Sequence, residues 1–308
     1  NKQKILLFFL FGFSIYSALT VGESSDEIYN LSHGKAALEY LFSIGRVNNQ
    51  IYYGEFYSPI YWSILYLLSK ISPLSYQIEV THLINLFFSF FVIFGIGKLT
   101  EELFNKKVGQ ITFLVLFFYP IFFGHMAFNN KDIIISLCHV WIFYLILKYL
   151  KKQNIKEKAN NYVVLIGFLA AVASGIQLVF LGSLITVFLF TLIDIFLLKK
   201  FTVQSFNKKT FLFDLFKAFI VFYFFLSLFW IETHHNIFKL QFDFFLNNLS
   251  NDVWRGWPYT LVNGNYYFSL VAPKLYFLLN FIFKSPEYFL LCYLIFIFTF
   301  IKIDNFYK

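Results

Sequence analysis

Long apolar runs separated by short, lysine-bearing loops are the feature that most constrains how this chain can fold. A helix needs about 20 apolar residues to cross a bilayer. The chain is 59% hydrophobic and only 14% charged, whereas soluble domains carry about 25% charged residues. We therefore predict an all-α, polytopic transmembrane helical bundle that forms a single domain, residues 1–308. Its eight predicted spans are 5–21, 76–97, 108–124, 133–150, 162–180, 183–198, 211–231 and 287–301.

The first apolar run, 5–21, has the positive flank and the length of a signal peptide. Residues 20–23, however, lack a small-residue cleavage site, and further spans follow. We interpret the run as an uncleaved first span that enters from the cytoplasm. The chain begins at Asn1 and ends directly after an apolar run, which suggests a truncated piece of a longer protein.

A further apolar run, 60–71, is too short to span, because 12 residues cover about 18 Å of a hydrocarbon core near 30 Å. If this run does not cross, every lysine cluster after it faces the cytoplasm, as the positive-inside rule requires. We predict an interfacial helix at 60–71, cytoplasmic termini, and outer loops 22–75, 125–132 and 232–286. The lysines that decide this topology are Lys98, Lys106, Lys107, Lys148, Lys151, Lys152, Lys156, Lys158, Lys199, Lys200, Lys208, Lys209, Lys302 and Lys308.

The formal net charge of +8 is the kind of value that nucleic-acid-binding proteins show. Here the lysines flank apolar runs, so the predicted partner is the lipid bilayer and not a nucleic acid. Cys138 and Cys292 both lie inside apolar runs, which argues against a disulfide.

The first outer loop opens with an acidic pair, Asp26-Glu27. One reading is structural: Ser24 or Ser25 caps a helix whose first turn is acidic. The other is functional: a carboxylate held at the membrane surface acts as a general base or a metal ligand. His33 follows Asp26 by seven residues, so the two share a helical face.

The predicted hairpin 125–132 carries Lys131 and Asp132 at the outer start of a span. The two side chains either offset each other in a solvated loop, or Lys131 meets a phosphate that Asp132 helps to orient. His33 and Tyr57 are candidate substrate-binding residues. The alternative for the aromatic residues near Tyr57 is that they anchor the loop at the bilayer interface, and Pro59 suits the first turn of the next helix.

The last outer loop, 232–286, contains two cations and several aromatic residues. Arg255 and Lys274 are candidate anion-binding residues, and Trp257 and Tyr266 either stack on a sugar or hold the loop at the interface. The adjacent pair His234-His235 does not share one helical face, so we predict no metal site there. Polar residues inside the apolar runs are functional candidates, and they are Glu79, His82, Asn85, Gln177 and Asp194.

The order of these short motifs resembles the GT-C class of membrane glycosyltransferases that use lipid-phosphate-linked sugars. More narrowly it resembles bacterial members of glycosyltransferase family 39, the relatives of protein O-mannosyltransferases and aminoarabinose transferases. The motifs that carry the resemblance are Asp26-Glu27, Ser58-Pro59-Ile60-Tyr61-Trp62, Phe128-Asn129-Asn130-Lys131-Asp132, Trp257-Pro258, Tyr266-Tyr267 and Lys284-Ser285-Pro286. Departures are Gln177, where some relatives have Arg, and Trp230-Ile231, where some have Trp-Pro.

The resemblance implies a hexosyltransferase of the bacterial inner membrane with its active site on the periplasmic face. The donor would be a polyprenyl-phosphate sugar, and the acceptor a hydroxyl of a glycan, lipid or protein. Asp26 would be the general base, with Glu27 supporting the site or the acceptor. Lys131, with Asp132, Arg255 and Lys274, would bind the donor phosphate. A variant of this scheme places a divalent metal ion at Asp26 and a histidine.

Other functions remain open from the residues alone. A transporter or lipid flippase would also be polytopic, but transporters place polar residues at the bilayer midplane and often contain inverted repeats. The polar residues here gather in the outer loops, and the sequence shows no repeat. A lipid-modifying or polymer-ligating membrane enzyme of another family is a further alternative.

Overall fold

The computed structural model describes residues 2–46, 57–250, 258–271 and 273–302. The described part of the chain is mostly helical, as predicted, with one two-stranded antiparallel sheet. Its α-helices are α1 (Lys2–Thr20), α2 (Ser25–Phe42), α3 (Ile60–Ser69), α4 (Gln77–Leu103), α5 (Lys106–Phe117), α6 (Pro120–His125), α7 (Asp132–Lys152), α8 (Lys156–Ile176), α9 (Phe180–Ile193), α10 (Lys208–Phe229), α11 (Lys239–Ser250), α12 (Tyr276–Lys284) and α13 (Glu287–Lys302). The strands are β1 (Tyr259–Val262) and β2 (Asn265–Phe268), and the short helical turns are η1 (Leu74–Tyr76), η2 (Asp194–Leu198), η3 (Ile231–Thr233) and η4 (Ser269–Val271).

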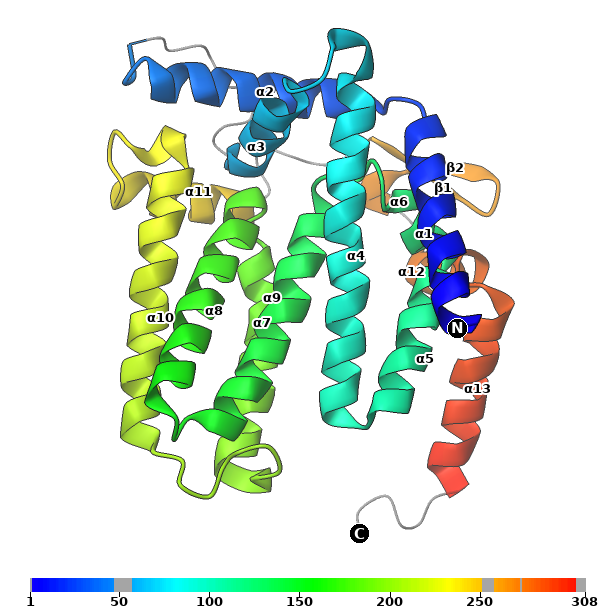
Figure 1. Ribbon diagram of the computed structural model, residues 1–308, viewed down its shortest axis with the longest axis vertical. Helices are drawn as coiled ribbons and strands as arrows, with labels where there is room; N and C mark the ends of the chain where they lie inside the picture. The colour runs from blue at the N-terminus through cyan, green and yellow to red at the C-terminus, as the bar shows by residue number, and fades with distance from the viewer. Residues whose placement is uncertain (1, 47–56, 251–257, 272, 303–308) are drawn as a thin grey trace.

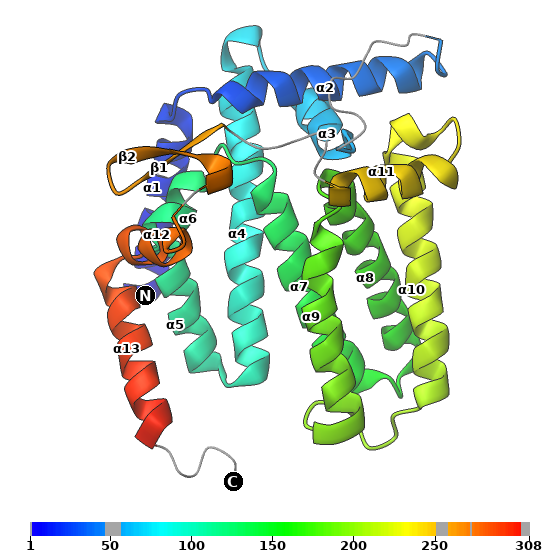
Figure 2. The same cartoon turned by 180° about the vertical axis from the view of Figure 1, so that it is seen from behind.

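Antiparallel helices form the body of the molecule, in which α10 packs on α8, α8 on α7, α7 on α4, and α4 on α5. Helix α9 packs against α7 and α8, and α1 packs against α4. In Figures 1 and 2, α2 lies across one end of this bundle, with α3 beneath it. We call this end the α2 end.

The opposite end holds the turn from α4 to α5, the turn from α7 to α8 and the loop from η2 to α10. Most of the lysines used to predict the topology lie in or beside these segments, and we call this the lysine-rich end. Glu102 forms ion pairs with Lys148 and Lys151 there. Buried Asp194 accepts hydrogen bonds from the Lys200 and Phe201 backbone and from the Thr202 hydroxyl. The described segments therefore confirm that these lysines share one end.

Five helical segments of the described chain are long and apolar enough to cross a membrane. They are Gln77–Leu103, Asp132–Lys152, Lys156–Ile176, Phe180–Leu198 and Lys208–Phe229. The pair α12–α13 would form a sixth, but it is bent by 114°. The predicted count of eight is therefore not confirmed.

Two further predicted spans, 5–21 and 108–124, form shorter helices than expected. The apolar part of α1 begins at Ile5 and ends at Thr20. Helix α5 ends at Phe117, and a new short helix begins at Pro120. Proline lacks the backbone N–H that would continue the helix, and it starts α6 instead. The 60–71 run forms a short apolar helix, α3, that packs against α2.

The β-hairpin is absent from the all-α prediction. Its turn is Asn263-Gly264, with φ of 48° and 79°, and Val262 pairs with Asn265 across it. A two-residue turn with both φ positive matches the twist of the strands it joins, and Asn-Gly is the sequence that most favours it. The signal was therefore present in the sequence and was missed.

Candidate active site

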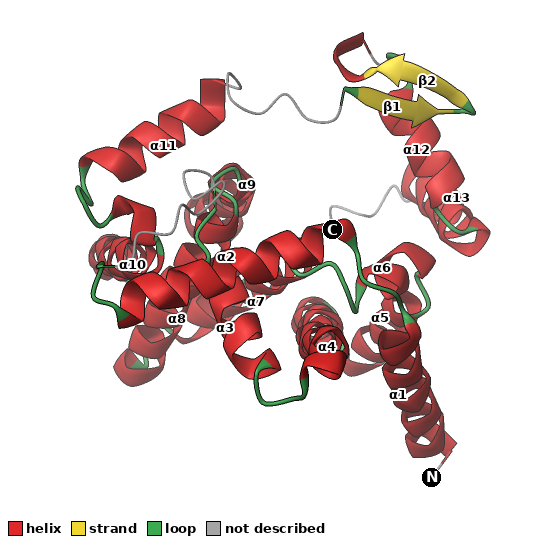
Figure 3. Ribbon diagram, turned by 90° about the horizontal axis from the view of Figure 1, so that it is seen from above, coloured by secondary structure: helices red, strands yellow, loops and turns green. Residues whose placement is uncertain are grey.

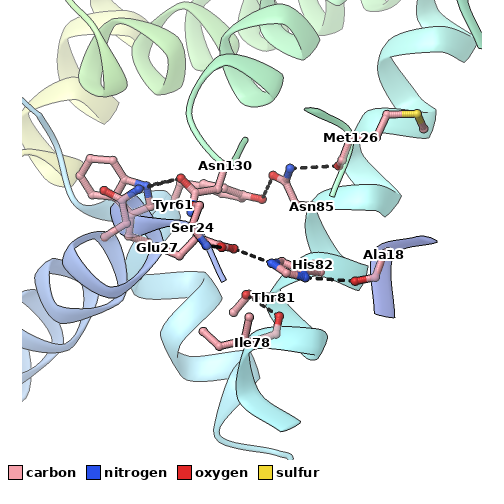
Figure 4. Close-up of polar contacts among 12 residues, drawn as sticks. Ala18, Ser24, Glu27, Tyr61, Ile78, Thr81, His82, Asn85, Met126 and Asn130 are labelled. Atoms are coloured by element: carbon pink, nitrogen blue, oxygen red, sulfur yellow. Dashed lines mark hydrogen bonds and ion pairs between the residues drawn. The ribbon is translucent and has the colours of Figure 1, made fainter. Parts of the chain in front are cut away.

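Glu27 and His82 form a buried pair at the junction of α1, α2 and α4 (Figure 4). The Glu27 side chain is 3% exposed and that of His82 is 0% exposed, and Oε1 of Glu27 lies 2.8 Å from Nε2 of His82. Oε2 of Glu27 accepts the backbone N–H of Ser24 at 2.7 Å. Ser24 is the N-cap of α2, so Glu27 closes a capping box at the third helical position.

The second ring nitrogen of His82 fixes the proton count of this pair. Nδ1 lies 3.0 Å from the carbonyl oxygen of Ala18, and a carbonyl can only accept, so Nδ1 carries a proton. Nε2 and Oε1 then need one more proton between them to form a favourable contact at 2.8 Å. With both ring nitrogens protonated, His82 forms a buried ion pair with Glu27.

Asp26 lies beside this pair but faces outward. It is exposed, whereas Glu27 is buried, because consecutive residues on a helix point about 100° apart. Its carboxylate is in the first turn of α2, where the positive end of the helix dipole favours a negative charge. Glu27 therefore has the structural role that the acidic pair was predicted to play, because it completes the cap. Asp26 remains accessible, as the functional hypothesis requires.

Asn130 joins α2, α3 and the 125–132 segment. Its Oδ1 accepts from Nδ2 of Asn30 at 2.9 Å and from Nε1 of Trp62 at 3.3 Å. Asn30 lies one helical turn after Asp26, so the hydrogen bond ties the Asp26-bearing end of α2 to the residue before Lys131. The Asn129-Asn130 motif was recognised in the sequence, whereas this contact was not predicted.

A second set of hydrogen bonds links α3, α4 and the 125–132 segment (Figure 4). The Tyr61 hydroxyl donates to Oδ1 of Asn85 at 3.0 Å, and Nδ2 of Asn85 donates to the Met126 carbonyl at 3.1 Å. Burial raises the pKa of Tyr61, which keeps the hydroxyl protonated as a donor. His82 and Asn85 are two of the polar residues found inside apolar runs, and each contacts the backbone of another segment, at Ala18 and at Met126.

Lys131 and Asp132 have separate partners at the start of α7. Nζ of Lys131 lies 4.0 Å from the centre of the Tyr57 ring, a cation–π distance. Asp132 accepts from Nδ2 of Asn129 at 3.0 Å, and Oδ1 of Asn129 accepts the Asp132 N–H at 3.0 Å. Among the ion pairs of the described residues, none joins Lys131 to Asp132. The hypothesis that the two side chains offset each other in a solvated loop is not supported.

The aromatic rings of Trp62, His33 and Tyr57 lie close together near Lys131. The Trp62 ring lies 5.7 Å from the His33 ring and 6.0 Å from the Tyr57 ring. His33 is buried, and burial lowers its pKa because desolvation disfavours the charged imidazolium. His33 is thus a covered neighbour of Trp62, while Asp26 on the same helix is exposed.

The segment before α3 is fixed to the ends of two long helices. The Ser58 N–H donates to the Gly175 carbonyl at 2.7 Å, and its Oγ donates to the Phe229 carbonyl at 2.8 Å. Both carbonyls lie at helix ends, where backbone acceptors lack partners within the helix. These bonds place Tyr57, and with it the ring under Lys131, relative to α8 and α10.

The remaining predicted site residues lie elsewhere or outside the described residues. Tyr266 on β2 and Lys274 before α12 are exposed, and Figure 3 shows the hairpin and α12 apart from α2 and α3. Arg255 and Trp257 lie outside the described residues. Trp62 contacts His33 and Tyr57, and Tyr57 contacts Lys131. The Asn30–Asn130 hydrogen bond links the helix that bears Asp26 and Glu27 to the residue before Lys131 and Asp132.

A metal ion at Asp26 and a histidine was an alternative. Within the ranges that the structure describes, no group of three or more His, Cys, Asp or Glu side chains is arranged to hold a metal ion. Glu27 and His82 contact each other, and their other polar atoms contact the Ser24 N–H and the Ala18 carbonyl.

Comparison of the chain with protein-family models, with curated proteins and with solved structures finds no match.

Proposed function

We propose that this chain is a membrane glycosyltransferase that moves a hexose from a polyprenyl-phosphate donor to a hydroxyl acceptor of a glycan, lipid or protein. The observation that carries the proposal is the Asn30–Asn130 hydrogen bond of 2.9 Å. It ties the helix end that bears an exposed carboxylate, Asp26, to the segment that bears a cation, Lys131. A base and an anion-binding group on one end of an apolar bundle suit the transfer of a sugar from a lipid phosphate.

In this scheme Asp26 takes the proton of the acceptor hydroxyl as its oxygen attacks the anomeric carbon. The bond from that carbon to the phosphate oxygen breaks, and the electron pair leaves with the polyprenyl phosphate. Lys131 stabilises the charge on that phosphate, an effect of several kcal/mol in a site that excludes water. Glu27 acts as a positioning residue, because its carboxylate is buried against His82.

The proposal includes a bacterial inner-membrane location with the α2 end outward. The lysine-rich end and both termini are then cytoplasmic, in agreement with the positive-inside rule. The GT-C fold and the eight-span topology are part of the same proposal, and the motif order that resembles glycosyltransferase family 39 supports them. Lys274, Arg255, Trp257 and Tyr266 would contribute from the last outer loop.

The decisive test compares sugar transfer and donor binding in the purified chain in nanodiscs. The probes are radiolabelled undecaprenyl-phosphate mannose for transfer and undecaprenyl phosphate for binding. Asp26→Asn should lower transfer at least about 100-fold, as expected for loss of a general base, and leave undecaprenyl phosphate binding unchanged. Glu23→Gln, which alters another exposed carboxylate of the same loop, should leave both unchanged.

The phosphate role is tested with a matched pair of lysines. Lys131 lies over Tyr57 at 4.0 Å, and Lys70 lies over Tyr66 at 4.8 Å. Lys131→Gln should weaken undecaprenyl phosphate binding about tenfold, the size of one lost charged hydrogen bond, and Lys70→Gln should not. Full transfer activity in Asp26→Asn would refute the assigned base. Uptake of a solute into sealed liposomes without a glycosylated product would indicate a transporter.

A further inference from the structure

A groove at the lysine-rich end runs between α1, α4 and α5. Its first section, about 440 Å³, is lined by Leu7 of α1, by Gly97 and Lys98 of α4, and by Lys106 and Phe113 of α5, among others. A second section of about 390 Å³ continues from it between the same three helices, with Leu7 and Phe113 in both. This groove is at the opposite end of the bundle from Asp26 and Lys131.

Two glycines, Gly97 and Gly109, line the α4–α5 side of the groove. A Cβ on Gly109 would lie 2.6 Å from the Gly97 carbonyl oxygen, and one on Gly97 would lie 3.3 Å from the Gly109 carbonyl oxygen. The two helices therefore touch at their backbones, and no side chain from either position enters the groove. Phe90, Phe117 and Phe11 line the deeper section, so its wall is apolar and aromatic.

The length of the groove fits one leaflet of a bilayer. Along α5 it extends from Lys106 to Phe117, which is about 16 Å at 1.5 Å per residue. Half of a hydrocarbon core near 30 Å is about 15 Å. A single acyl chain in the leaflet at the lysine-rich end would therefore lie along the whole groove.

The mouth of the groove is polar and carries a net positive charge. Lys98, Glu101 and Lys106 line it. Nζ of Lys98 lies 2.9 Å from Oε2 of Glu101, so these two charges offset each other. Lys106 is exposed and takes part in none of the ion pairs found among the described residues. One cation is thus left at the depth of the lipid headgroups.

We propose that this groove binds an acidic glycerophospholipid, with its phosphate at Lys106 and one acyl chain along Leu7, Phe113 and Phe117. Basic pockets between transmembrane helices on the cytoplasmic side recognise anionic headgroups in this way. The site is separate from the proposed glycosyltransferase chemistry and does not depend on it.

Native mass spectrometry of the full chain tests the headgroup contact. The probes are phosphatidylglycerol and phosphatidylcholine with identical acyl chains. Lys106→Gln should weaken phosphatidylglycerol binding about fivefold, the effect of one lysine near a membrane surface. The matched control is Lys156→Gln, because Lys156 is also exposed and also begins a helix at the lysine-rich end. It should leave phosphatidylglycerol binding unchanged.

A second pair of variants tests the acyl-chain contact. Leu7→Trp fills the part common to both sections and should weaken the binding of both lipids. Ile5→Trp alters a similarly exposed residue of α1 that does not line the groove, and it should have no effect. Unchanged thermal unfolding of each variant shows that it is folded. Equal phosphatidylglycerol binding by the two lysine variants, or by the two tryptophan variants, would overturn the proposal.

Discussion

Asp26 and Glu27 are neighbours in sequence that meet different surroundings. Glu27 turns toward α4, where its Oε1 lies 2.8 Å from Nε2 of His82, whereas Asp26 stays exposed beside it. A general base must reach its substrate, and a positioning residue must be held in place. In the proposed scheme these two tasks fall to neighbouring residues, with Glu27 holding the turn that presents Asp26.

Substitutions at Glu27 should separate its hydrogen bonds from its charge. In Glu27→Gln, the amide oxygen can accept the Ser24 N–H and the amide N–H can donate to a neutral His82, so only the charge assistance is lost. We expect a cost of about 1 kcal/mol in the free energy of unfolding. Glu27→Ala leaves two buried groups without partners and should cost about 3 kcal/mol. Chemical denaturation in detergent measures both values.

The control for this series is the exposed Glu23. Glu23→Ala should change the free energy of unfolding by less than about 0.5 kcal/mol, as surface substitutions do. If Glu27→Ala were as mild as Glu23→Ala, the buried pair would not stabilise the junction of α1, α2 and α4. If Glu27→Gln cost as much as Glu27→Ala, the charge would matter more than the hydrogen bonds.

His33 should make stability depend on pH. Burial lowers its pKa in the folded state, so the unfolded chain binds the proton more readily, at a pKa near 6.5. The unfolded state therefore gains protons first as the pH falls, and stability is lost from about pH 6.5 downward. Thermal unfolding between pH 7.5 and 5.5 should show a larger loss in the wild-type protein than in His33→Gln. The same loss in His33→Gln would contradict this, and exposed His235→Gln is the control.

Individual residues of the site were predictable where their chemistry was local. The Ser24 cap and the acidic first turn of α2 follow from a pattern of a few residues, and the structure confirms them. The Glu27–His82 pair was not predictable, because it joins residues 55 positions apart. A polar residue inside an apolar run indicates that a partner exists, but only the packing of α2 over α4 shows which residue it is.

At the scale of elements, α2 can lie on α3 because of one glycine. A Cβ on Gly34 would lie 2.2 Å from the Trp62 carbonyl oxygen. The close approach allows the Ser63 hydroxyl to lie 3.4 Å from the Gly34 carbonyl and brings Trp62 within reach of Asn130. The position of the exposed Asp26 thus depends on a backbone contact two helical turns away.

Gly34→Ala should push α2 off α3. Alanine favours a helix over glycine by about 1 kcal/mol, yet the steric overlap should cost about 3 kcal/mol, so we expect a net loss of about 2 kcal/mol. Gly12→Ala is the matched control, because Gly12 is also helical but its Cβ would meet nothing within 4 Å. Unfolding of both variants in detergent measures the difference in stability. Equal stabilities would show that the two helices accommodate the added methyl group without cost.

The accuracy of the predicted elements depended on how strongly local sequence decides the structure. The long apolar runs of α4, α7, α8 and α10 were predicted because length and hydropathy alone favour a helix. The break between Phe117 and Pro120 was missed, although a proline inside an apolar run is a signal for it. The Asn263-Gly264 turn was also missed, although Asn-Gly is a signal for a hairpin.

At the scale of the molecule, the two ends of the bundle differ in lysine content and in the roles that we propose for them. The lysine-rich end holds the turns between long helices, and the α2 end holds the proposed active site. Lysine positions in the sequence predict this division, because the insertion of a membrane protein depends on them. The start of α13 at Glu287 was predicted, whereas helix α12 and the 114° bend between the two helices were not.

Cysteine labelling should place the two ends on opposite sides of a membrane. Ser32→Cys on α2 and Lys156→Cys at the start of α8 replace exposed residues. In a Cys292→Ser background, the remaining Cys138 is buried. A membrane-impermeant maleimide added to sealed, oriented vesicles should label one variant before permeabilisation and the other only after it. Labelling of both from the same side would contradict the topology.

The hydrogen bond between Asn30 and Asn130 can form only late in synthesis, because the two residues are far apart in the sequence. The two residues are 100 positions apart, and at a synthesis rate of about 5–20 residues per second the second emerges about 5–20 s after the first. During that interval the inward stripe of α2, with Glu27 and Gly34, has no completed bundle to lie on. Membrane chaperones and proteases therefore have access to α2 before its partner helices are made. Substitutions at Asn130 should lower the amount of mature protein more than they lower the stability of the protein that matures.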